Sequence, residues 1–289
     1  MPGTLPITVG IPTYQRGDRV LQVLQHLQAC DPAPAEILVF LDAGDAALEN
    51  RIREAFPAVI ILASAERIGP GGGRHRMLQA ATQPWLVSLD DDSWPVDADF
   101  FARLQRHTEE ADDVAVIGAV VHHQGQEMPV LANWVRTVSD YTGCGHAMRV
   151  AAYRGISGYV DRPNAYGLEE RDVALQFHGA GWRVRRCGDL RVFHDTRLIH
   201  HKKPAVVAAT IENAALLAWL RYPVVLWPYG LLQFANVICF MISSGRLGGI
   251  LRGVLNTPME IWRHRHLRMP LPVAKVFSYL RLRHQPLTP

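Results

Sequence analysis

The chain has 289 residues, of which 48% are hydrophobic and 20% are charged, and its formal net charge is +3. This hydrophobic content is enough to build a core, which excludes a disordered chain, and the length suits one large α/β domain with or without an appendage. The four cysteines show no C-x-x-C spacing, and they are Cys30, Cys144, Cys187 and Cys239. They therefore indicate neither a zinc site nor a disulfide framework, and they favour a reducing compartment. The first residues show no charged segment followed by an apolar run, so we expect no secretion signal.

Strand and helix patterns alternate through the first half of the chain. Alternating elements of this kind predict a largely parallel sheet that is covered by helices on both faces. The expected strands are 7–12, 36–42, 59–63, 85–89 and 114–121, and the expected helices are 19–29, 46–55 and the later part of 67–81.

Three consecutive carboxylates follow the buried strand 85–89. In an extended chain, Asp90 and Asp92 would point to one side and Asp91 to the other. Two such like charges repel by roughly 1 kcal/mol in water and about 4 kcal/mol at an effective dielectric of 20, which calls for a cation. A hard divalent metal bound to phosphate oxygens satisfies that need. A solvated acidic turn is the alternative, but the end of a strand is where open α/β sheets bind ligands.

A glycine-rich segment precedes this strand. Gly69 and three further glycines lead into Arg74 at the expected start of a helix, where backbone N–H groups and the helix dipole attract phosphate. The segment is neither a P-loop nor a G-x-G-x-x-G motif, and a flexible turn with exposed arginines is the alternative. A phosphate-attracting loop followed by metal-binding acids predicts a diphosphate site.

Together these motifs resemble glycosyltransferase family 2, with the GT-A fold, over roughly residues 5 to 200. The segment IPTYQR at 11–16 is similar to the opening strand and nucleotide-binding turn of the family, and GGGRHRMLQAA is similar to its arginine-bearing helix start. LDDDSWP resembles its D-x-D motif. The resemblance implies a Rossmann-like, mostly parallel sheet flanked by helices, and Mn or Mg as the cofactor. It implies that the donor is bound by these residues: Pro12, Thr13, Tyr14, Arg16, Asp42, Gly69, Arg74, Asp90 and Asp91.

A second acidic group occurs in the stretch 166–184. Glu169, Glu170 and Asp172 stand at the entry to a predicted helix, where the helix dipole alone favours acids by about 0.3 to 1 kcal/mol each. The stretch also resembles the E-D motif of the family, whose second acid acts as the base on the acceptor hydroxyl. The matching residue is Glu170, and Asp172 and Glu169 are the substitutes.

A histidine near the end of the short strand 191–195 is the remaining candidate ligand. Relatives place a histidine at this point, so the resemblance implies that His194 joins Asp90 and Asp92 around the metal. Imidazole is a reasonable third ligand for Mn. The lysines and histidines at 200–203 would form a basic surface or a lid.

The last third of the chain departs from the sheet pattern, and we expect a domain of residues 1–203 followed by a helical region of residues 204–289. No charge occurs from 222 to 245, although Pro223 and Pro228 argue against a clean membrane-spanning helix. Beyond it, apolar residues from Leu247 to Leu255 lie beside arginines, as in a helix that rests in a membrane interface. We expect peripheral attachment to the cytoplasmic face of a membrane and no nucleic acid partner. A helical hairpin that packs on its own domain or on a dimer partner is the alternative.

The function predicted from these observations is the transfer of a sugar, with inversion, from a nucleotide-diphosphate sugar to a hydroxyl of a saccharide or lipid-linked acceptor. A haloacid-dehalogenase-like phosphatase also uses D-x-D after a strand, but that motif normally opens its domain. A non-catalytic sugar-nucleotide-binding scaffold is the other alternative. The identities of the sugar, nucleotide and acceptor, and the oligomeric state, are left open by the sequence.

Overall fold

A computed structural model describes residues 3–163, 167–196 and 203–285 of the chain. The chain divides into two compact units, which we describe separately: residues 1–163 with 182–197, and residues 164–181 with 198–289. The division differs from the boundary expected at residue 203. The helix that carries Glu170 belongs to the second unit, because it packs on helices from the C-terminal region.

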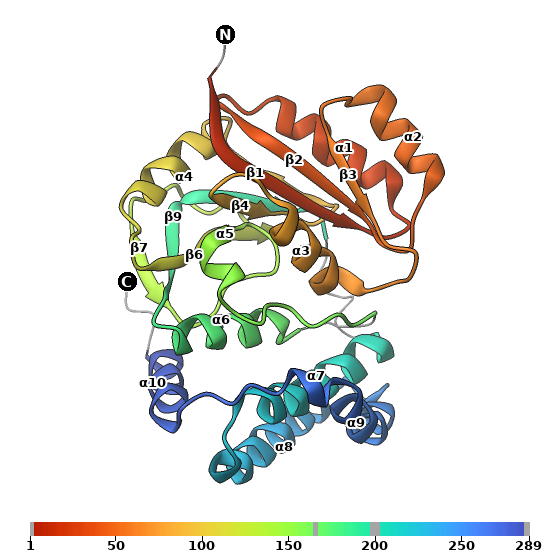
Figure 1. The fold of residues 1–289 in the computed structure, drawn as a ribbon, viewed down its shortest axis with the longest axis vertical. Helices are drawn as coiled ribbons and strands as arrows, with labels where there is room; N and C mark the ends of the chain where they lie inside the picture. Colours follow the sequence, from red (N-terminus) through yellow and green to blue (C-terminus); the bar gives the residue numbers. More distant parts are fainter. Residues whose placement is uncertain (1–2, 164–166, 197–202, 286–289) are drawn as a thin grey trace. The chain divides into compact units, whose positions relative to one another are not determined.

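The first unit is built on one mixed sheet (Figure 1). Its strand order is β3-β2-β1-β4-β8-β6-β9-β5, and β7 pairs with β9. The strands are β1 Thr4–Thr13, β2 Ala33–Leu41, β3 Ile60–Ala63, β4 Trp85–Ser88, β5 Ser93–Pro95, β6 Val114–His123, β7 Val135–Val138, β8 His146–Arg149 and β9 Arg183–His194. The helices are α1 Gly17–Gln28, α2 Ala46–Ala55, α3 Gly69–Ala80, α4 Phe100–Glu109 and α5 Val150–Arg154.

Parallel pairing is concentrated in the first half of the sheet. β3, β2, β1 and β4 run parallel to one another, as the alternating pattern predicts. Beyond β4 the sheet is mixed, because β8 runs antiparallel to both β4 and β6, whereas β9 runs parallel to β6. The carboxyl ends of β1, β2 and β4 therefore meet at one edge, where an open sheet places its ligands.

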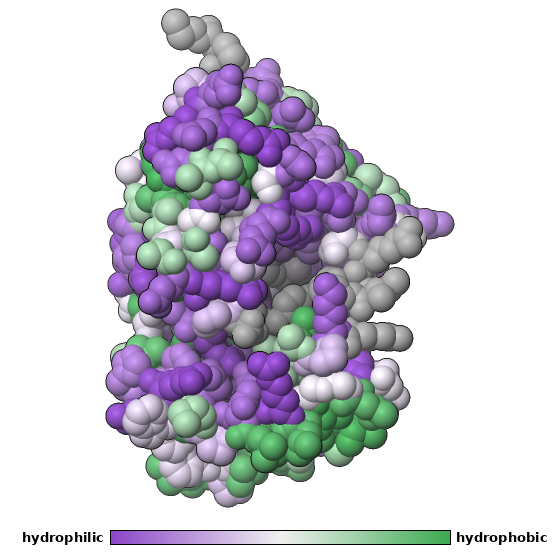
Figure 2. Space-filling model, turned by 90° about the vertical axis from the view of Figure 1, so that its right-hand side faces the viewer, coloured by the Kyte–Doolittle hydropathy of each residue, from purple (hydrophilic) through white to green (hydrophobic). Residues whose placement is uncertain are grey.

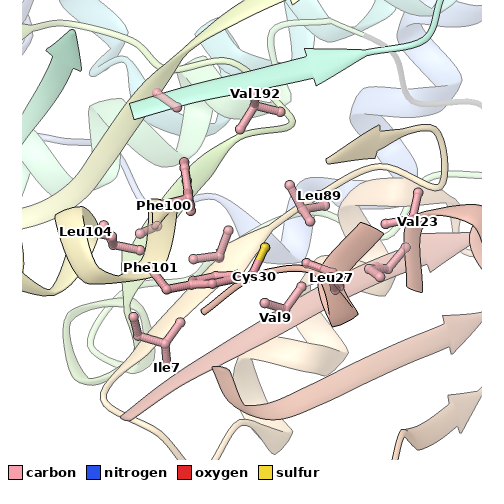
Figure 3. Close-up of a cluster of buried hydrophobic side chains, with 14 of the residues drawn as sticks. Ile7, Val9, Val23, Leu27, Cys30, Leu89, Phe100, Phe101, Leu104 and Val192 are labelled. Atoms are coloured by element: carbon pink, nitrogen blue, oxygen red, sulfur yellow. The ribbon is translucent and has the colours of Figure 1, made fainter. Parts of the chain in front are cut away.

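The two faces of the sheet are covered by different helices, and β1 shows why. Its alternate residues Ile7, Val9 and Ile11 are fully buried in the core formed with α1 and α4. Figure 3 shows Ile7 and Val9 in this core. Gly10 faces the other side, where an added Cβ would lie 3.2 Å from the Met77 sulfur on α3. The period-2 pattern of a strand thus fixes one helical layer on each face.

The second unit contains helices and no strand within residues 167–181 and 203–285. Its elements are α6 Glu169–Gly179, α7 Pro204–Arg221, the 3₁₀ turn Val224–Leu226, α8 Trp227–Ser243, α9 Ile250–His264, the 3₁₀ turn Arg265–Leu267 and α10 Val273–His284. α7 packs on α6, α8 and α9, and α6 also contacts α10. Pro228 lies in the first turn of α8, where the missing N–H costs nothing, so the helix starts at this proline and is not interrupted by it.

Candidate active site

The three aspartates lie in a tight turn between β4 and β5. The Ser93 N–H donates to the Asp90 carbonyl at 3.1 Å, and the Asp90 N–H donates to the Ser93 hydroxyl at 2.8 Å. The chain is therefore not extended here, and the alternation expected for an extended strand does not apply. The turn brings all three carboxylates to the carboxyl edge of the parallel strands, where their directions are set by specific partners.

Arg16, just beyond the end of β1, joins two of these acids. Its guanidinium donates to Asp91 at 2.8 Å and to Asp92 at 2.5 Å. The Thr13 hydroxyl donates to the other oxygen of Asp91 at 2.8 Å. The side chain of Arg16 is 45% exposed, whereas Asp91 and Asp92 are buried. The opening turn and the acidic turn are thus one connected structure, which the sequence pattern did not predict.

Asp90 is held from the other side by Arg74 of α3. The Arg74 guanidinium is buried, donates to Asp90 at 2.5 Å and donates to the Ser88 hydroxyl at 3.0 Å. The Asp90 side chain is 28% exposed, the most open of the three carboxylates. Positive charge therefore lines the acidic turn on both sides, and Asp90 faces solvent.

His194 reaches this turn because β9 pairs with β5. Ser93 and His194 are direct partners in the antiparallel register. The Nε2 atom of His194 lies 3.0 Å from an Asp92 oxygen and 3.7 Å from an Asp90 oxygen. The histidine and the aspartates, about a hundred residues apart, are thus brought together as the sequence analysis expected.

Burial and neighbouring charges compete in this cluster, and they shift the pKa values of its side chains in different directions. Burial raises the pKa of Asp91 to about 7, against the opposing influence of Arg16. Burial also disfavours the ionised form of Asp92, but the hydrogen bonds from His194 and Arg16 outweigh it and lower the pKa of Asp92. Burial opposes the charged form of His194 too, yet its hydrogen bond to Asp92 and the nearby carboxylates raise the pKa of His194. Asp92 is thus kept ionised beside a cationic partner.

The donor atoms of this cluster suit a divalent cation. Carboxylate oxygens from Asp90 and Asp92 and an imidazole nitrogen from His194 are groups that Mn²⁺ accepts, and Mg²⁺ accepts the carboxylates. Atoms of Asp90, Cys144 and His194 that can bind a metal lie within 4.8 Å of one another. The exposed Asp90 leaves one side of the cluster open to a ligand.

The glycine-rich segment was predicted to bind phosphate through its backbone N–H groups, and in the structure a carboxylate binds two of these groups. Both Asp42 oxygens accept backbone N–H groups at the start of α3, from Ile68 at 2.7 Å and from Gly69 at 2.9 Å. Pro70, the next residue, has no N–H to offer. Two of the N–H groups at this helix start are therefore engaged by a carboxylate, which leaves fewer of them for a phosphate.

Close packing explains the glycines instead. Gly69 has φ +77°, and an added Cβ would clash with the Arg162 carbonyl oxygen. A Cβ on Gly73 would lie 2.9 Å from the Phe40 ring and 3.2 Å from Pro12. Glycine lets α3 approach β1 and β2 closely enough for Arg74 to reach Asp90. Tyr14 also packs beside the site, with the Arg67 guanidinium 4.3 Å from its ring centroid.

The acids on α6 occupy two different environments within the second unit. Asp172 is buried, and the buried Arg221 of α7 donates to both of its oxygens, at 2.6 and 3.0 Å. Glu169 and Glu170, in the first helical turn, are partly exposed. The Asn213 side chain fixes the entry to the helix by donating to the Gly167 carbonyl at 2.7 Å. Asp172 thus has a structural ion pair, whereas the two glutamates lie at the accessible end of the helix.

Comparison with known proteins identifies the family. The family model described as Glycosyl transferase family 2 matches residues 8–154, which span β1 to α5 and include the acidic turn. The chain belongs to glycosyltransferase family 2. A search among curated proteins gave no match.

Solved structures share the fold of this family 2 member at low identity. GalNAc-T7 with UDP, GalNAc and Mn²⁺ is 14% identical, with a TM-score of 0.60 over 78% of this chain and 49% of that one. The mannosyltransferase PcManGT from Pyrobaculum calidifontis with GDP-Man and Mn²⁺ is also 14% identical, with a TM-score of 0.58 over 99% and 89%. TarS 1–349 of S. aureus with UDP-GlcNAc is 14% identical, with a TM-score of 0.57 over 74% and 66%. The chain thus spans about half the length of GalNAc-T7, and the predicted GT-A fold is confirmed.

Two further residues near this cluster, Cys144 and His146, are buried. Cys144 lies 3.5 Å from His194 through its sulfur, and His146 follows two residues later at the start of β8. Burial, aided by Arg74, lowers the pKa of His146 to about 3, so this histidine is neutral and unsuited to act as a general acid. The sequence did not predict the contact of Cys144 with His194, because the two residues are 50 positions apart.

Proposed function

We propose that this family 2 protein is a metal-dependent, inverting glycosyltransferase that uses a nucleotide-diphosphate sugar. The observation that carries the proposal is the cluster of Asp90, Asp92 and His194 at the carboxyl edge of β1 and β4, flanked by Arg16 and Arg74. The partly exposed Asp90, beside fixed guanidinium groups, suits a diphosphate that arrives with a divalent cation.

Asp90, Asp92 and His194 would hold Mn²⁺ or Mg²⁺ in this proposal. The ion, when bound, supplies Lewis-acid stabilisation of the charge that develops on the diphosphate leaving group. GalNAc-T7 and PcManGT were solved with Mn²⁺ and a nucleotide or nucleotide sugar, which supports this assignment. Arg74 contributes a second, fixed positive charge beside the same group.

The donor would be recognised by the opening turn. Pro12, Thr13, Tyr14 and Arg16 lie at the end of β1, next to the acidic turn. Thr13 and Arg16 fix Asp91, so part of their contribution is to keep the acidic turn in place. Asp42 and Gly69 contribute by anchoring α3, and hence Arg74, rather than through a phosphate cradle.

Glu170 is the proposed base. The acceptor hydroxyl must lose its proton in the transition state, and a partly exposed carboxylate in the first turn of α6, where the helix dipole favours negative charge, can accept it. Asp172 is less suited, because Arg221 and Gln176 donate to its oxygens. A single displacement with one base and no covalent intermediate inverts the anomeric configuration.

Turnover with a panel of UDP-, GDP- and dTDP-sugars tests the proposal, with release of the nucleoside diphosphate in the presence of saccharide acceptors as the signal. We expect release with one donor class, and Glu170→Gln should lower kcat by about 10²- to 10⁴-fold while donor binding persists. Glu169→Gln, one residue earlier on the same turn, is the matched control. Binding without release in the wild type would favour a non-catalytic scaffold, and phosphate release from a simple phosphate ester would favour a phosphatase.

We further propose that the helical unit rests on the cytoplasmic face of a membrane, where it would meet a lipid-linked or polysaccharide-precursor acceptor. Among the described residues, Val224–Ser243 is the helical stretch long and apolar enough to cross a membrane, and only 17% of its apolar window is buried. On α9, Leu251, Leu255, Met259 and Trp262 all point outward. Hydrophobic side chains gather over this unit in Figure 2. Arginines 246, 252, 263 and 265 lie beside them, suited to anionic lipid.

The outward face of α9 differs from the single stripe expected from the sequence. Ile250 and Val254 turn inward and pack on the cluster around α7, whereas Leu251 and Leu255 are 71% and 68% exposed. Sedimentation with vesicles that contain phosphatidylglycerol tests the membrane proposal. The double variant Leu251→Glu with Leu255→Glu should bind at least about tenfold more weakly, since each leucine contributes about 1.5 to 3 kcal/mol when buried. Ile60→Glu, an exposed site in the other unit, is the control, and unchanged binding in the α9 variant would refute the proposal.

A further inference from the structure

The Cys144 thiol is held rigidly beside the proposed metal ligand His194. It is 1% exposed, and its sulfur lies 3.5 Å from His194 Nδ1. The next residue, Gly145, is fixed between two strands: its N–H donates to the Ser88 carbonyl and its carbonyl accepts the Ala119 N–H, both at 2.8 Å. Gly145 also has φ +71°, and an added Cβ would lie 3.0 Å from Val192. The sulfur therefore has little freedom to move away from the imidazole.

The two nitrogens of His194 face different partners. Nε2 points to Asp92 at 3.0 Å and to Asp90 at 3.7 Å, whereas Nδ1 points to the Cys144 sulfur. One ring carbon separates these two nitrogens, and their lone pairs point in diverging directions. An ion bound by Nε2 would thus lie towards the aspartates, whereas the sulfur lies at Nδ1, so the same imidazole does not present one ion to both, although an Asp90 oxygen is within 4.8 Å of the sulfur.

We infer that Cys144 is a positioning residue that orients the His194 ring so that Nε2 faces the ion held by Asp90 and Asp92. The inference rests on the proposed metal site and adds to it the group that supports its nitrogen ligand. A thiol is a weak donor and a weak acceptor, so it can pair with Nδ1 whether or not that atom carries a proton. The ring can thus keep one orientation with and without metal. Groups that orient a ligating histidine in this way change metal affinity by about 10- to 100-fold when they are removed.

Titration of Mn²⁺ alone, followed by calorimetry, tests the inference on the full chain. Cys144→Ala should weaken Mn²⁺ binding by about 10- to 100-fold, and Cys144→Ser, which keeps a hydroxyl beside Nδ1, should lose clearly less. Cys239→Ala, at an exposed cysteine on α8, should match the wild type. An unchanged affinity in Cys144→Ala would overturn the inference. An equal loss in the Ser and Ala variants would also overturn it, because both variants shrink the side chain and only one removes the polar group.

Two spectroscopic measurements separate this inference from the proposed function. In metal-free protein, Cys144→Ala should move the ¹⁵N resonance of His194 Nδ1 more than that of Nε2, and no movement of either would overturn the inference. This result does not depend on metal, so a wild type that fails to bind Mn²⁺ would refute the metal site separately. With Co²⁺, the wild type should show no thiolate-to-metal charge-transfer absorption. Such a band, lost in Cys144→Ser, would make the thiol a ligand and overturn its positioning role.

Discussion

Replacement of Arg221 by methionine tests how the acid-bearing helix α6 is held. In the wild type, Arg221 and Asp172 form a buried pair with both carboxylate oxygens engaged, and Gln176 donates to one of them at 3.1 Å. Methionine has a similar length and keeps the apolar contacts, but it leaves Asp172 without its cation. The perturbation therefore removes charge compensation more than packing.

The expected cost is about 3 to 5 kcal/mol, the range found when one partner of a buried ion pair is removed. This cost has an upper limit, because Asp172 can take up a proton in the variant and so lose its uncompensated charge. At about pH 7, protonating a carboxylic acid of ordinary aspartate pKa costs about 4 kcal/mol, or three pKa units at 1.36 kcal/mol each, so the cost at this pH should fall between about 3 and 4 kcal/mol. The deficit should therefore shrink as the pH falls towards about 4, because protonation then becomes cheap.

Hydrogen exchange followed by mass spectrometry of peptides from α6 and α7 measures this effect within the helical unit. We expect opening in Arg221→Met to increase by about 10² to 10³-fold at about pH 7, and the double variant with Asp172→Asn to recover part of the loss. A deficit under about 1 kcal/mol that does not depend on pH would refute the reasoning. It would mean that the pair is solvated and that Asp172 is available as a base.

Two further predictions concern the first unit in its metal-free form. Gly69→Ala should lower the free energy of unfolding by more than Gly125→Ala, as measured in urea, because both have positive φ but only Gly69 would contact the Arg162 carbonyl. Equal losses would mean that backbone strain alone matters. Because burial raises the pKa of Asp91 to about 7, above its ordinary value, the stability linked to its proton is present in acid and is lost as the pH rises from about 4 to about 7. Asp91→Asn should therefore gain stability relative to the wild type across that range in urea denaturation, and a constant difference would contradict the raised pKa.

The sequence predicted the first unit well where the pattern is local. The runs 7–12, 36–42 and 85–89 alternate with helical spacing, and each became a strand of the parallel half of the sheet. The acidic turn and His194 were recognised through their family resemblance, and the structure brings them together. These features depend on short segments whose chemistry is evident from residue type alone.

The remaining features depend on contacts between distant segments. Asp42 and the glycines are separate binding motifs in the sequence, but in the structure Asp42 caps α3 some 26 residues later and accepts two of the N–H groups at its start. The assignment of α6 to the helical unit depends on the pairing of Asp172 with Arg221, which no spacing rule reveals. Cys144 was set aside because it has no C-x-x-C partner, yet its neighbour in space is a histidine 50 residues away.

Metal-dependent binding of a nucleoside diphosphate is the most direct test of the proposed donor site. Calorimetric titration of UDP and GDP, with and without Mn²⁺, should show one nucleotide that binds tightly only when Mn²⁺ is present. Asp92→Asn should lose that dependence, whereas Asp113→Asn, at a half-exposed acid paired with Arg183, should retain it. If neither nucleotide binds in a metal-dependent way, or if Asp92→Asn behaves as the wild type, the acidic turn is not a diphosphate site and the proposed function is contradicted.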